Sequence, residues 1–184
     1  MNSDKNRVCP VERAHALDGK IRRWLHNPNR ILSPFVKEGM KVLDIGCGPG
    51  LFSIESARLV GARGRVIAAD LQDGMLERVR RKIAGTDLKH RVKLVRCDQD
   101  NINVSEKVDL IVAFYMVHEV PDKSVLFRQF RNVLNVSGQV LLVEPKMFHV
   151  SRKEFTATVK LAEECGFRVH QGPRIRFSWS AVLV

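Results

Sequence analysis

The sequence has no run of apolar residues long enough to span a membrane, and it has no internal repeat or low-complexity stretch. Its first residues, 1–7, are polar and lack the apolar segment of a secretory signal peptide. At 184 residues, of which 45% are hydrophobic, the chain has the size and composition of one domain with a substantial core. We therefore expect a single domain over residues 1–184, located in the cytoplasm.

Cysteine is scarce and scattered. The four thiols lie at Cys9, Cys47, Cys97 and Cys165, and no C-x-x-C pair occurs. This spacing favours reduced thiols over a disulfide framework or a structural zinc site. No set of His, Asp and Glu has the spacing of metal ligands either, so we expect that the protein needs no metal.

Acidic residues are outnumbered, 20 to 31, by lysines and arginines, which gives a formal charge of +11 and a pI near 10.0. Such a charge favours an anionic partner, such as RNA, a nucleotide-like substrate or an acidic surface. The basic residues are dispersed, however, with denser patches at 78–82 and 89–96, and there is no arginine-rich tail or aromatic RNA-binding signature. A generally basic surface is the favoured interpretation, and nucleic-acid binding stays open.

From residue 41 onwards, apolar strand-like runs alternate with helical patterns. Repeated strand–helix units imply a parallel α/β sheet with right-handed crossovers. The final two strands have only residues 172–174 between them, so they must pair antiparallel or lie apart. A turn is expected at Ser137-Gly138. Strands are predicted at 41–45, 65–69, 92–96, 108–114, 139–144, 167–171 and 175–183, and helices at 51–60, 73–84, 123–134 and 152–165.

The N-terminal arm, residues 1–37, precedes this alternation. Apolar residues within 14–25 recur at helical spacing, and a short second helix is expected at 28–36. An amphipathic helix must bury its apolar face against something. We expect residues 1–30 to form a lid over the substrate, and packing on the sheet edge alone is the alternative.

A glycine-rich turn joins the first predicted strand to its helix, with the sequence Val42-Leu43-Asp44-Ile45-Gly46-Cys47-Gly48-Pro49-Gly50. Glycine has no Cβ, so such a turn lets a ligand approach the backbone. The dinucleotide fingerprint is G-x-G-x-x-G, whereas the spacing here is G-x-G-x-G followed by Leu51. The pattern Asp-x-Gly-x-Gly-x-Gly resembles motif I of class I S-adenosylmethionine (SAM)-dependent methyltransferases. An ordinary tight turn is the alternative.

In that family the loop packs against the methionine end of SAM, and the acid contacts the cofactor, often through water. The resemblance implies that Asp44, Gly46, Cys47, Gly48 and Gly50 bind SAM. It also implies a Rossmann-like α/β fold with a seven-stranded, mostly parallel sheet of order 3-2-1-4-5-7-6. In that fold the last strand is antiparallel and helices cover both faces.

Polar residues follow the second and third predicted strands. Asp70 ends the second strand, and its carboxylate can accept hydrogen bonds from vicinal ribose hydroxyls. Capping of the next helix is the alternative role, but Asp73 is better placed for it. The resemblance implies that Asp70 holds the SAM ribose, that Leu71 lies against adenine, and that Asp98 with Gln99 contacts the adenine amino group.

The end of the fourth strand should lie next to the methyl group. Methyltransferases of exocyclic base amines usually carry Asn/Asp-Pro-Pro-Tyr here, and this chain does not. The run MVHEVPD, residues 116–122, instead resembles the small-molecule, quinone-biosynthesis-like branch of the family. The resemblance implies that Phe114 flanks the methionine part of SAM. His118 and Glu119 act on the substrate as base or anchor, or are polar rim residues.

These residues together predict a methyltransferase that moves a methyl group from SAM to a small-molecule acceptor and leaves S-adenosyl-L-homocysteine. The Glu144-Pro145 pair ends the fifth strand at the expected substrate mouth. RNA or protein methylation is an alternative motivated by charge, and a SAM-binding regulatory module is another. A thiolate set of Cys9, Cys47 and Cys97 for a soft metalloid is the remaining alternative.

Overall fold

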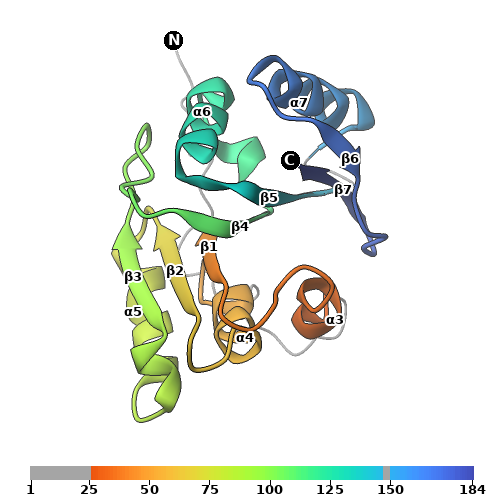
Figure 1. The fold of residues 1–184 in the computed structure, drawn as a ribbon. Coiled ribbons are helices and arrows are strands. Elements are labelled where there is room, and N and C mark those ends of the chain that lie inside the picture. The colour runs from red at the N-terminus through yellow and green to blue at the C-terminus, as the bar shows by residue number, and fades with distance from the viewer. Residues whose placement is uncertain (1–25, 147–149) are drawn as a thin grey trace.

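The computed structural model describes residues 26–146 and 150–184. Figure 1 shows a central sheet with helices on both sides of it. The helices are α3 (Pro28–Leu32), α4 (Leu51–Leu59), α5 (Asp73–Ile83), α6 (Lys123–Val133) and α7 (Arg152–Glu164), with the short 3-10 helices η2 (Asp87–His90) and η3 (Val117–Glu119). The strands are β1 (Lys41–Ile45), β2 (Arg65–Asp70), β3 (Val92–Arg96), β4 (Val108–Phe114), β5 (Leu134–Pro145), β6 (Val169–Gln171) and β7 (Ser178–Leu183).

The seven strands form one sheet in the order β3-β2-β1-β4-β5-β7-β6. The pairs β2–β3, β1–β2, β1–β4 and β4–β5 are parallel, and β7 pairs antiparallel with both β5 and β6. This architecture confirms the predicted fold class, strand order and antiparallel last strand. The reversal of strand order between β1 and β4 is the place where ligands bind in such sheets, at the carboxyl ends of the strands.

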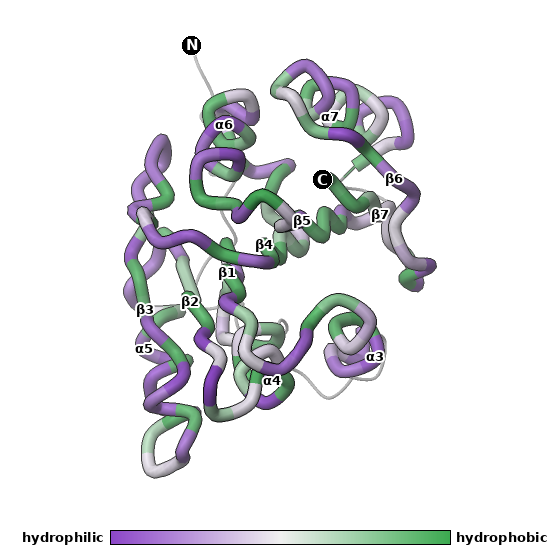
Figure 2. The backbone as a smooth tube through the Cα atoms, in the orientation of Figure 1, coloured by the Kyte–Doolittle hydropathy of each residue, from purple (hydrophilic) through white to green (hydrophobic). Residues whose placement is uncertain are grey.

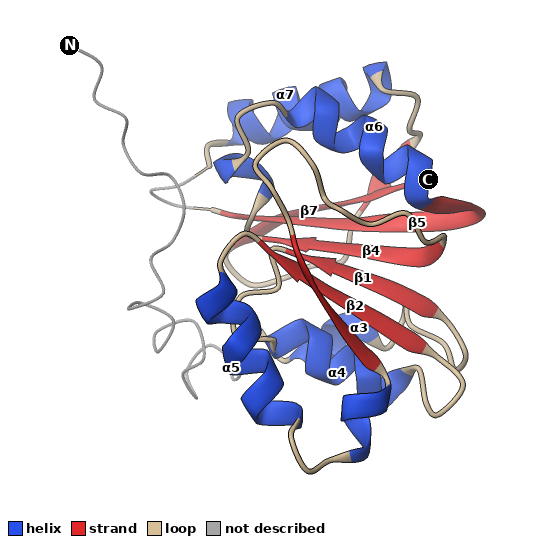
Figure 3. Ribbon diagram, turned by 90° about the vertical axis from the view of Figure 1, so that its left-hand side faces the viewer, coloured by secondary structure: helices blue, strands red, loops and turns tan. Residues whose placement is uncertain are grey.

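Alternate residues of the buried strands supply two separate hydrophobic layers. Val42, Leu110 and Val112 belong to the layer under α3, α4 and α5. Leu43 and Ile111 belong to the layer under α6 and α7. Figure 3 shows these helices on opposite faces, and Figure 2 shows β5 and β7 as largely hydrophobic. Strands covered on both faces need apolar side chains at successive positions, which explains the continuous apolar runs.

The start of β5 differs from the prediction. The expected turn at Ser137-Gly138 is wrong, because β5 begins at Leu134 and continues through both residues. Its register against β4 shifts between Val108 and Leu110, so the extra residues form an irregularity within the strand. A Cβ on Gly138 would lie 2.8 Å from Leu134 Cδ2, which shows how closely this irregularity folds back on itself.

The bounds of several other helices and strands differ from the predicted ones by a few residues. The helix expected at 28–36 ends at Leu32, and Val36 is nevertheless buried in the core. The last two strands are shorter than predicted, at 169–171 and 178–183. The helix expected at 14–25 lies outside the described residues. Within the part of the chain that the structure describes, none of the helices has the length and apolar character needed to cross a bilayer.

Candidate cofactor and acceptor site

The three glycines of the turn after β1 all have left-handed backbone angles, with φ of 67° at Gly46, 52° at Gly48 and 86° at Gly50. A Cβ on Gly46 would lie 2.7 Å from Met116 Cβ, and one on Gly50 would lie 2.8 Å from Val79 Cγ2. A Cβ on Gly48 would have no heavy atom within 4 Å. Gly46 and Gly50 therefore allow close packing within the protein, whereas Gly48 leaves open space beside the backbone.

Asp70 bonds to the backbone of Gly48 from the end of β2. Its Oδ2 accepts a hydrogen bond from the Gly48 amide at 2.8 Å, and its Oδ1 accepts one from the Gln72 amide at 2.9 Å. Burial raises the pKa of Asp70, and the amide hydrogen bonds of Gln72, Gly48 and Leu71 offset part of that rise. A carboxylate has about four acceptor positions, so Asp70 retains acceptor capacity for a hydroxyl group besides these three amides.

Asp44 lies deeper than the other acids of the predicted site. Its carboxylate is buried, with 2% of the residue exposed, and its Oδ2 accepts from Ser53 Oγ at 2.5 Å. This bond ties the end of β1 to α4 behind the loop. Burial raises the pKa of Cys47 well above its ordinary value, and the negative charges of Asp44 and Asp70 add to the effect.

Cys97 is buried at the end of β3. Burial raises its pKa to about 12, with further contributions from the charges of Asp70 and Asp98. Both described cysteines of the hypothetical metalloid set, Cys47 and Cys97, are therefore thiols near neutral pH and poor soft-metal ligands. Cys9 lies outside the described residues.

The residues predicted for adenine lie at the ends of β2 and β3. The Cys97 amide donates to the Asp70 carbonyl at 3.0 Å, which holds the two strand ends together. Leu71 is half-buried, whereas Asp98 and Gln99 are exposed. Asp98 Oδ2 accepts from Asn103 Nδ2 at 2.9 Å, which fixes the carboxylate at the rim.

Phe114 ends β4 and is buried against aromatic neighbours. Its ring stacks on Phe52 of α4 with centroids 4.2 Å apart, and Tyr115 lies 4.5 Å away. Tyr115 in turn has a left-handed backbone with φ of 62°. Its hydroxyl lies 2.6 Å from Ser178 Oγ and 3.1 Å from His26 Nε2.

Sequence reasoning missed this network of His26, Tyr115 and Ser178. Tyr115 is 89 positions from His26 and 63 positions from Ser178 along the chain, so no local pattern connects the three residues. His26 is 6% exposed, and its Nε2 lies 3.1 Å from the Arg176 carbonyl.

His118 lies beside Glu144 at the ends of β4 and β5. Glu144 is 2% exposed, and it accepts hydrogen bonds from the Val117 and His118 amides at 3.1 Å each. His118 Nδ1 lies 2.6 Å from Glu144 Oε2, and Nε2 lies 4.0 Å from Glu119 Oε1. Burial alone lowers the pKa of His118, but the hydrogen bond and charge of Glu144, aided by Glu119, outweigh burial and raise it overall.

The sequence predicted that Glu144 lies at the substrate mouth, but it did not predict that Glu144 pairs with His118. The pairing depends on the register of β5 and on the turn of η3, because together they bring residues 26 positions apart into contact. The structure thus brings His118 together with a buried carboxylate and leaves Glu119 half-buried beside it.

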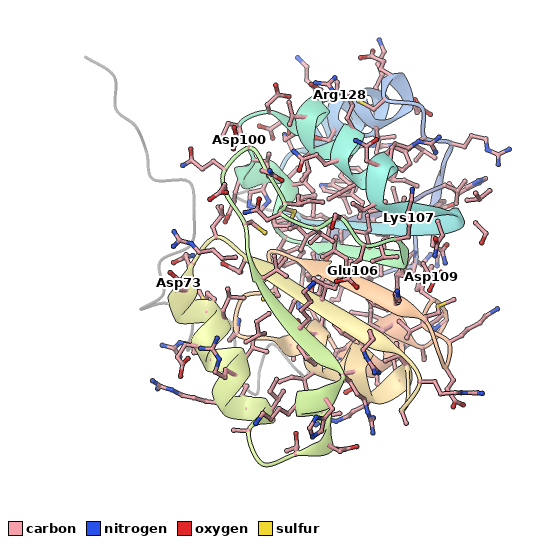
Figure 4. The ribbon with its side chains drawn as sticks, turned by 60° about the vertical axis from the view of Figure 1, so that its left-hand side comes forward. Asp73, Asp100, Glu106, Lys107, Asp109 and Arg128 are labelled. Atoms are coloured by element: carbon pink, nitrogen blue, oxygen red, sulfur yellow. The ribbon has the colours of Figure 1, made fainter. Side chains whose placement is uncertain are left out.

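Figure 4 shows Asp73 and Asp100 on the side of the sheet where the parallel strands end, and Lys107 and Asp109 on the opposite side. A hollow of about 520 Å³ opens at the amino ends of β1, β2 and β3, away from the predicted site. Its lining includes Lys41, Arg63, Arg65, His90, Arg91 and Lys93. A second hollow of about 280 Å³ borders Gly50 and α4 and includes no other predicted cofactor residue.

A family model described as "Methyltransferase domain" matches residues 42–138, which is more than half of the chain and includes the glycine turn, Asp70 and His118. The chain belongs to the class I SAM-dependent methyltransferase family. The open position at Gly48 and the acceptor capacity of Asp70 fit the cofactor of this family, S-adenosyl-L-methionine, at the switch in strand order.

The curated relatives of this chain include the ubiquinone/menaquinone biosynthesis C-methyltransferase UbiE of Idiomarina loihiensis, which is 34% identical over 110 residues, 59% of this chain and 44% of the relative. The same-named protein of a Marinomonas species is 33% identical over 129 residues, 70% of this chain and 51% of the relative. The chain therefore spans about half the length of the curated relatives it matches.

Among solved structures, a SAM-dependent methyltransferase from Aquifex aeolicus is similar to this chain with a TM-score of 0.84 and 24% identity. The similarity covers 96% of this chain and all of that one. At this identity the likeness shows the fold alone.

Proposed function

We propose that this chain transfers the methyl group of SAM to a small-molecule acceptor of the quinone type. The observation that carries the proposal is the open backbone at Gly48 beside the buried Asp70, at the switch in strand order of a methyltransferase sheet. The acceptor class follows from the UbiE relatives, whose name describes a ubiquinone/menaquinone biosynthesis C-methyltransferase.

The cofactor residues have distinct proposed roles. Asp70 accepts from the ribose hydroxyls, and charge-assisted bonds of this kind are about twice as strong as neutral ones. The exposed Asp98 and Gln99 accept from and donate to adenine, with Leu71 against the ring. The buried Phe114 forms the wall beside the methionine part. Asp44, because it is buried against Ser53, acts by holding the turn of residues 46–50 in place.

The chemistry needs positioning more than activation. When bound, SAM supplies a sulfonium methyl that is transferred in line: the acceptor electron pair forms the new bond to carbon while the carbon–sulfur pair returns to sulfur. The chain must align the acceptor and exclude water, and such positioning is worth ~7–11 kcal/mol in favourable cases. No step in this scheme requires a metal.

His118 is the proposed base. Its Nδ1 is held by Glu144, so the neutral imidazole carries its proton there and presents Nε2 as the acceptor. The proton released by the acceptor passes to Nε2 as the new bond forms. Glu144 is a positioning residue that fixes the tautomer, and Glu119 is an alternative anchor 4.0 Å from Nε2.

Residues 1–30 are proposed to act as a lid within a single domain, with the rest of the arm to residue 37 leading into β1. A lid would exclude water and contribute cationic groups to an anionic acceptor. A cytoplasmic location is also proposed, since the scattered cysteines favour a reducing compartment.

Methylation of RNA or protein is a second candidate, favoured by the basic hollow at the amino ends of β1–β3. Binding of generic RNA would then fall steeply with salt, because phosphate contacts release counterions.

A screen with methyl-labelled SAM tests the proposed function. The purified chain is incubated with reduced quinone-type compounds, RNA and protein in parallel, and the labelled product is identified by mass spectrometry. Label on a quinone-type ring is expected. Label only on RNA or protein would favour the second candidate. Binding of SAM without transfer to any acceptor would favour a regulatory module.

A further inference from the structure

Phe177 occupies a backbone conformation that a bulky residue rarely adopts. Its φ is 55°, in the left-handed region, and its exposed fraction is 48%. A bulky residue in this region is strained. Exposure means that burial of the ring offsets little of this cost, so folding stability gives no reason for an aromatic side chain here.

The surrounding hydrogen bonds hold Phe177 in this conformation. The adjoining Ser178 Oγ lies 2.6 Å from Tyr115 Oη and donates to the Arg176 carbonyl at 3.1 Å. The Phe177 carbonyl accepts from the Lys146 amide at 2.8 Å. The entry to β7 is therefore tied both to the end of β4 and to the end of β5.

This position lies at the edge where an acceptor must enter. β7 runs antiparallel to β5, so Ser178 pairs with Pro145 at the carboxyl end of β5. Glu144, which holds His118, is the residue just before Pro145 and pairs with Trp179. Phe177 thus lies one residue before β7, beside the carboxyl end of β5, the strand whose Glu144 holds His118.

A positively charged group lies on one side of the Phe177 ring. The Arg176 guanidinium lies 5.1 Å from the Phe177 ring centroid. A cation over one face of an aromatic ring draws on its π-electrons. The exposed part of the ring therefore favours stacking with an electron-rich or anionic planar ring.

We propose that Phe177, with Arg176 behind it, is the stacking platform that selects a planar, electron-rich aromatic acceptor at the mouth of the site. This inference rests on the proposed function and specifies which residue recognises the acceptor ring. The strain at Phe177 is retained because it holds the ring at the mouth.

The test uses the full chain and 1,4-naphthohydroquinone, kept reduced under anaerobic conditions, as the probe. Phe177→Asn removes the ring while keeping a residue that tolerates the left-handed region. We expect the KM and the Kd of the probe to rise about 2- to 13-fold, the range for one stacked aromatic pair. The Kd of SAM and the melting temperature should stay at or above their unaltered values. Phe177→Tyr should restore probe binding.

Val136→Asn is the matched control, because Val136 is the other large hydrophobic residue that is exposed in the described part of the chain. It lies near the start of β5, at the opposite edge, and its replacement should leave probe binding unchanged. An unchanged probe Kd in Phe177→Asn would overturn the proposal, as would failure of the unaltered chain to bind the probe. A parallel loss of SAM affinity and melting temperature would also overturn it. Probe binding without methyl transfer would instead count against the proposed function.

Discussion

Alanine substitutions in the glycine turn separate protein stability from cofactor affinity. A left-handed backbone costs a non-glycine residue ~1–2 kcal/mol. Gly48→Ala pays this cost alone, because a Cβ there meets nothing within 4 Å. Gly46→Ala and Gly50→Ala also place a Cβ within 2.7 and 2.8 Å of other side chains. Such overpacking adds ~1–3 kcal/mol.

These costs predict different melting temperatures. A chain of this size loses about 2–4 °C for each kcal/mol, so Gly48→Ala should lower the melting temperature by roughly 2–8 °C. The same arithmetic gives roughly 4–20 °C for Gly46→Ala and Gly50→Ala. The affinity for SAM should not follow the order of the melting temperatures, because the new methyl group of Gly48→Ala occupies space assigned to SAM. Overpacking of ~1–3 kcal/mol corresponds to a rise in SAM Kd of about 5- to 150-fold.

The assay combines thermal unfolding with calorimetric titration of SAM. Gly85→Ala is the matched control, since Gly85 has φ of 73° and an open Cβ position but follows α5, away from the turn. It should lose stability as Gly48→Ala does and bind SAM normally. Unaltered SAM affinity in Gly48→Ala would refute the reasoning that the open side of Gly48 faces the cofactor.

Four further outcomes are expected. Glu144→Gln removes the charge that raises the pKa of His118, so burial should then lower that pKa. The acid limb of the plot of kcat against pH should therefore move to lower pH. An acid limb that does not move would show that His118 is not the base. The His118–Glu144 pair should add most to the free energy of unfolding at pH values below the ordinary imidazole pKa. Unfolding measured at a series of pH values should show that the pair's contribution is lost as the pH rises through the raised pKa of His118. Deletion of residues 1–25, which keeps His26 and α3 in place, should leave SAM binding largely intact while methyl transfer falls steeply. Trp24→Ala should give part of the loss, and transfer at the full-length rate would rule out a lid. A chelator should not reduce activity, and activity lost to chelation and restored by magnesium would contradict the metal-free scheme.

Much of the fold followed from local sequence. β1, β3 and β4 have the predicted bounds because each is a short segment in which apolar residues predominate. The strand order came from the family resemblance and is confirmed. The start of β5 was wrong, because the irregularity opposite Val108 and Leu110 is set by pairing with another strand, which a local pattern does not record.

Only part of the site could be predicted, because contacts between distant parts of the chain leave no local pattern in the sequence. The residues at strand ends lie at one edge, as the topology requires, although their roles as ligands of SAM stay predictions. The partners of His118 and Tyr115 were missed because they come from β5, β7 and His26, far along the chain. The left-handed backbone angles of Tyr115 and Phe177 could not be predicted from the sequence either, since tertiary contacts impose them.

Calorimetric titration of the full chain with SAM, S-adenosyl-L-homocysteine and NADH tests the central claim most directly. SAM and its product should bind at one shared site, and NADH should not bind. Asp70→Ala should weaken SAM binding by about 10- to 150-fold, because it removes charge-assisted hydrogen bonds worth ~1.5–3 kcal/mol. Unchanged affinity in that variant would remove Asp70 from the ribose site. Binding of NADH in place of SAM would contradict the account as a whole.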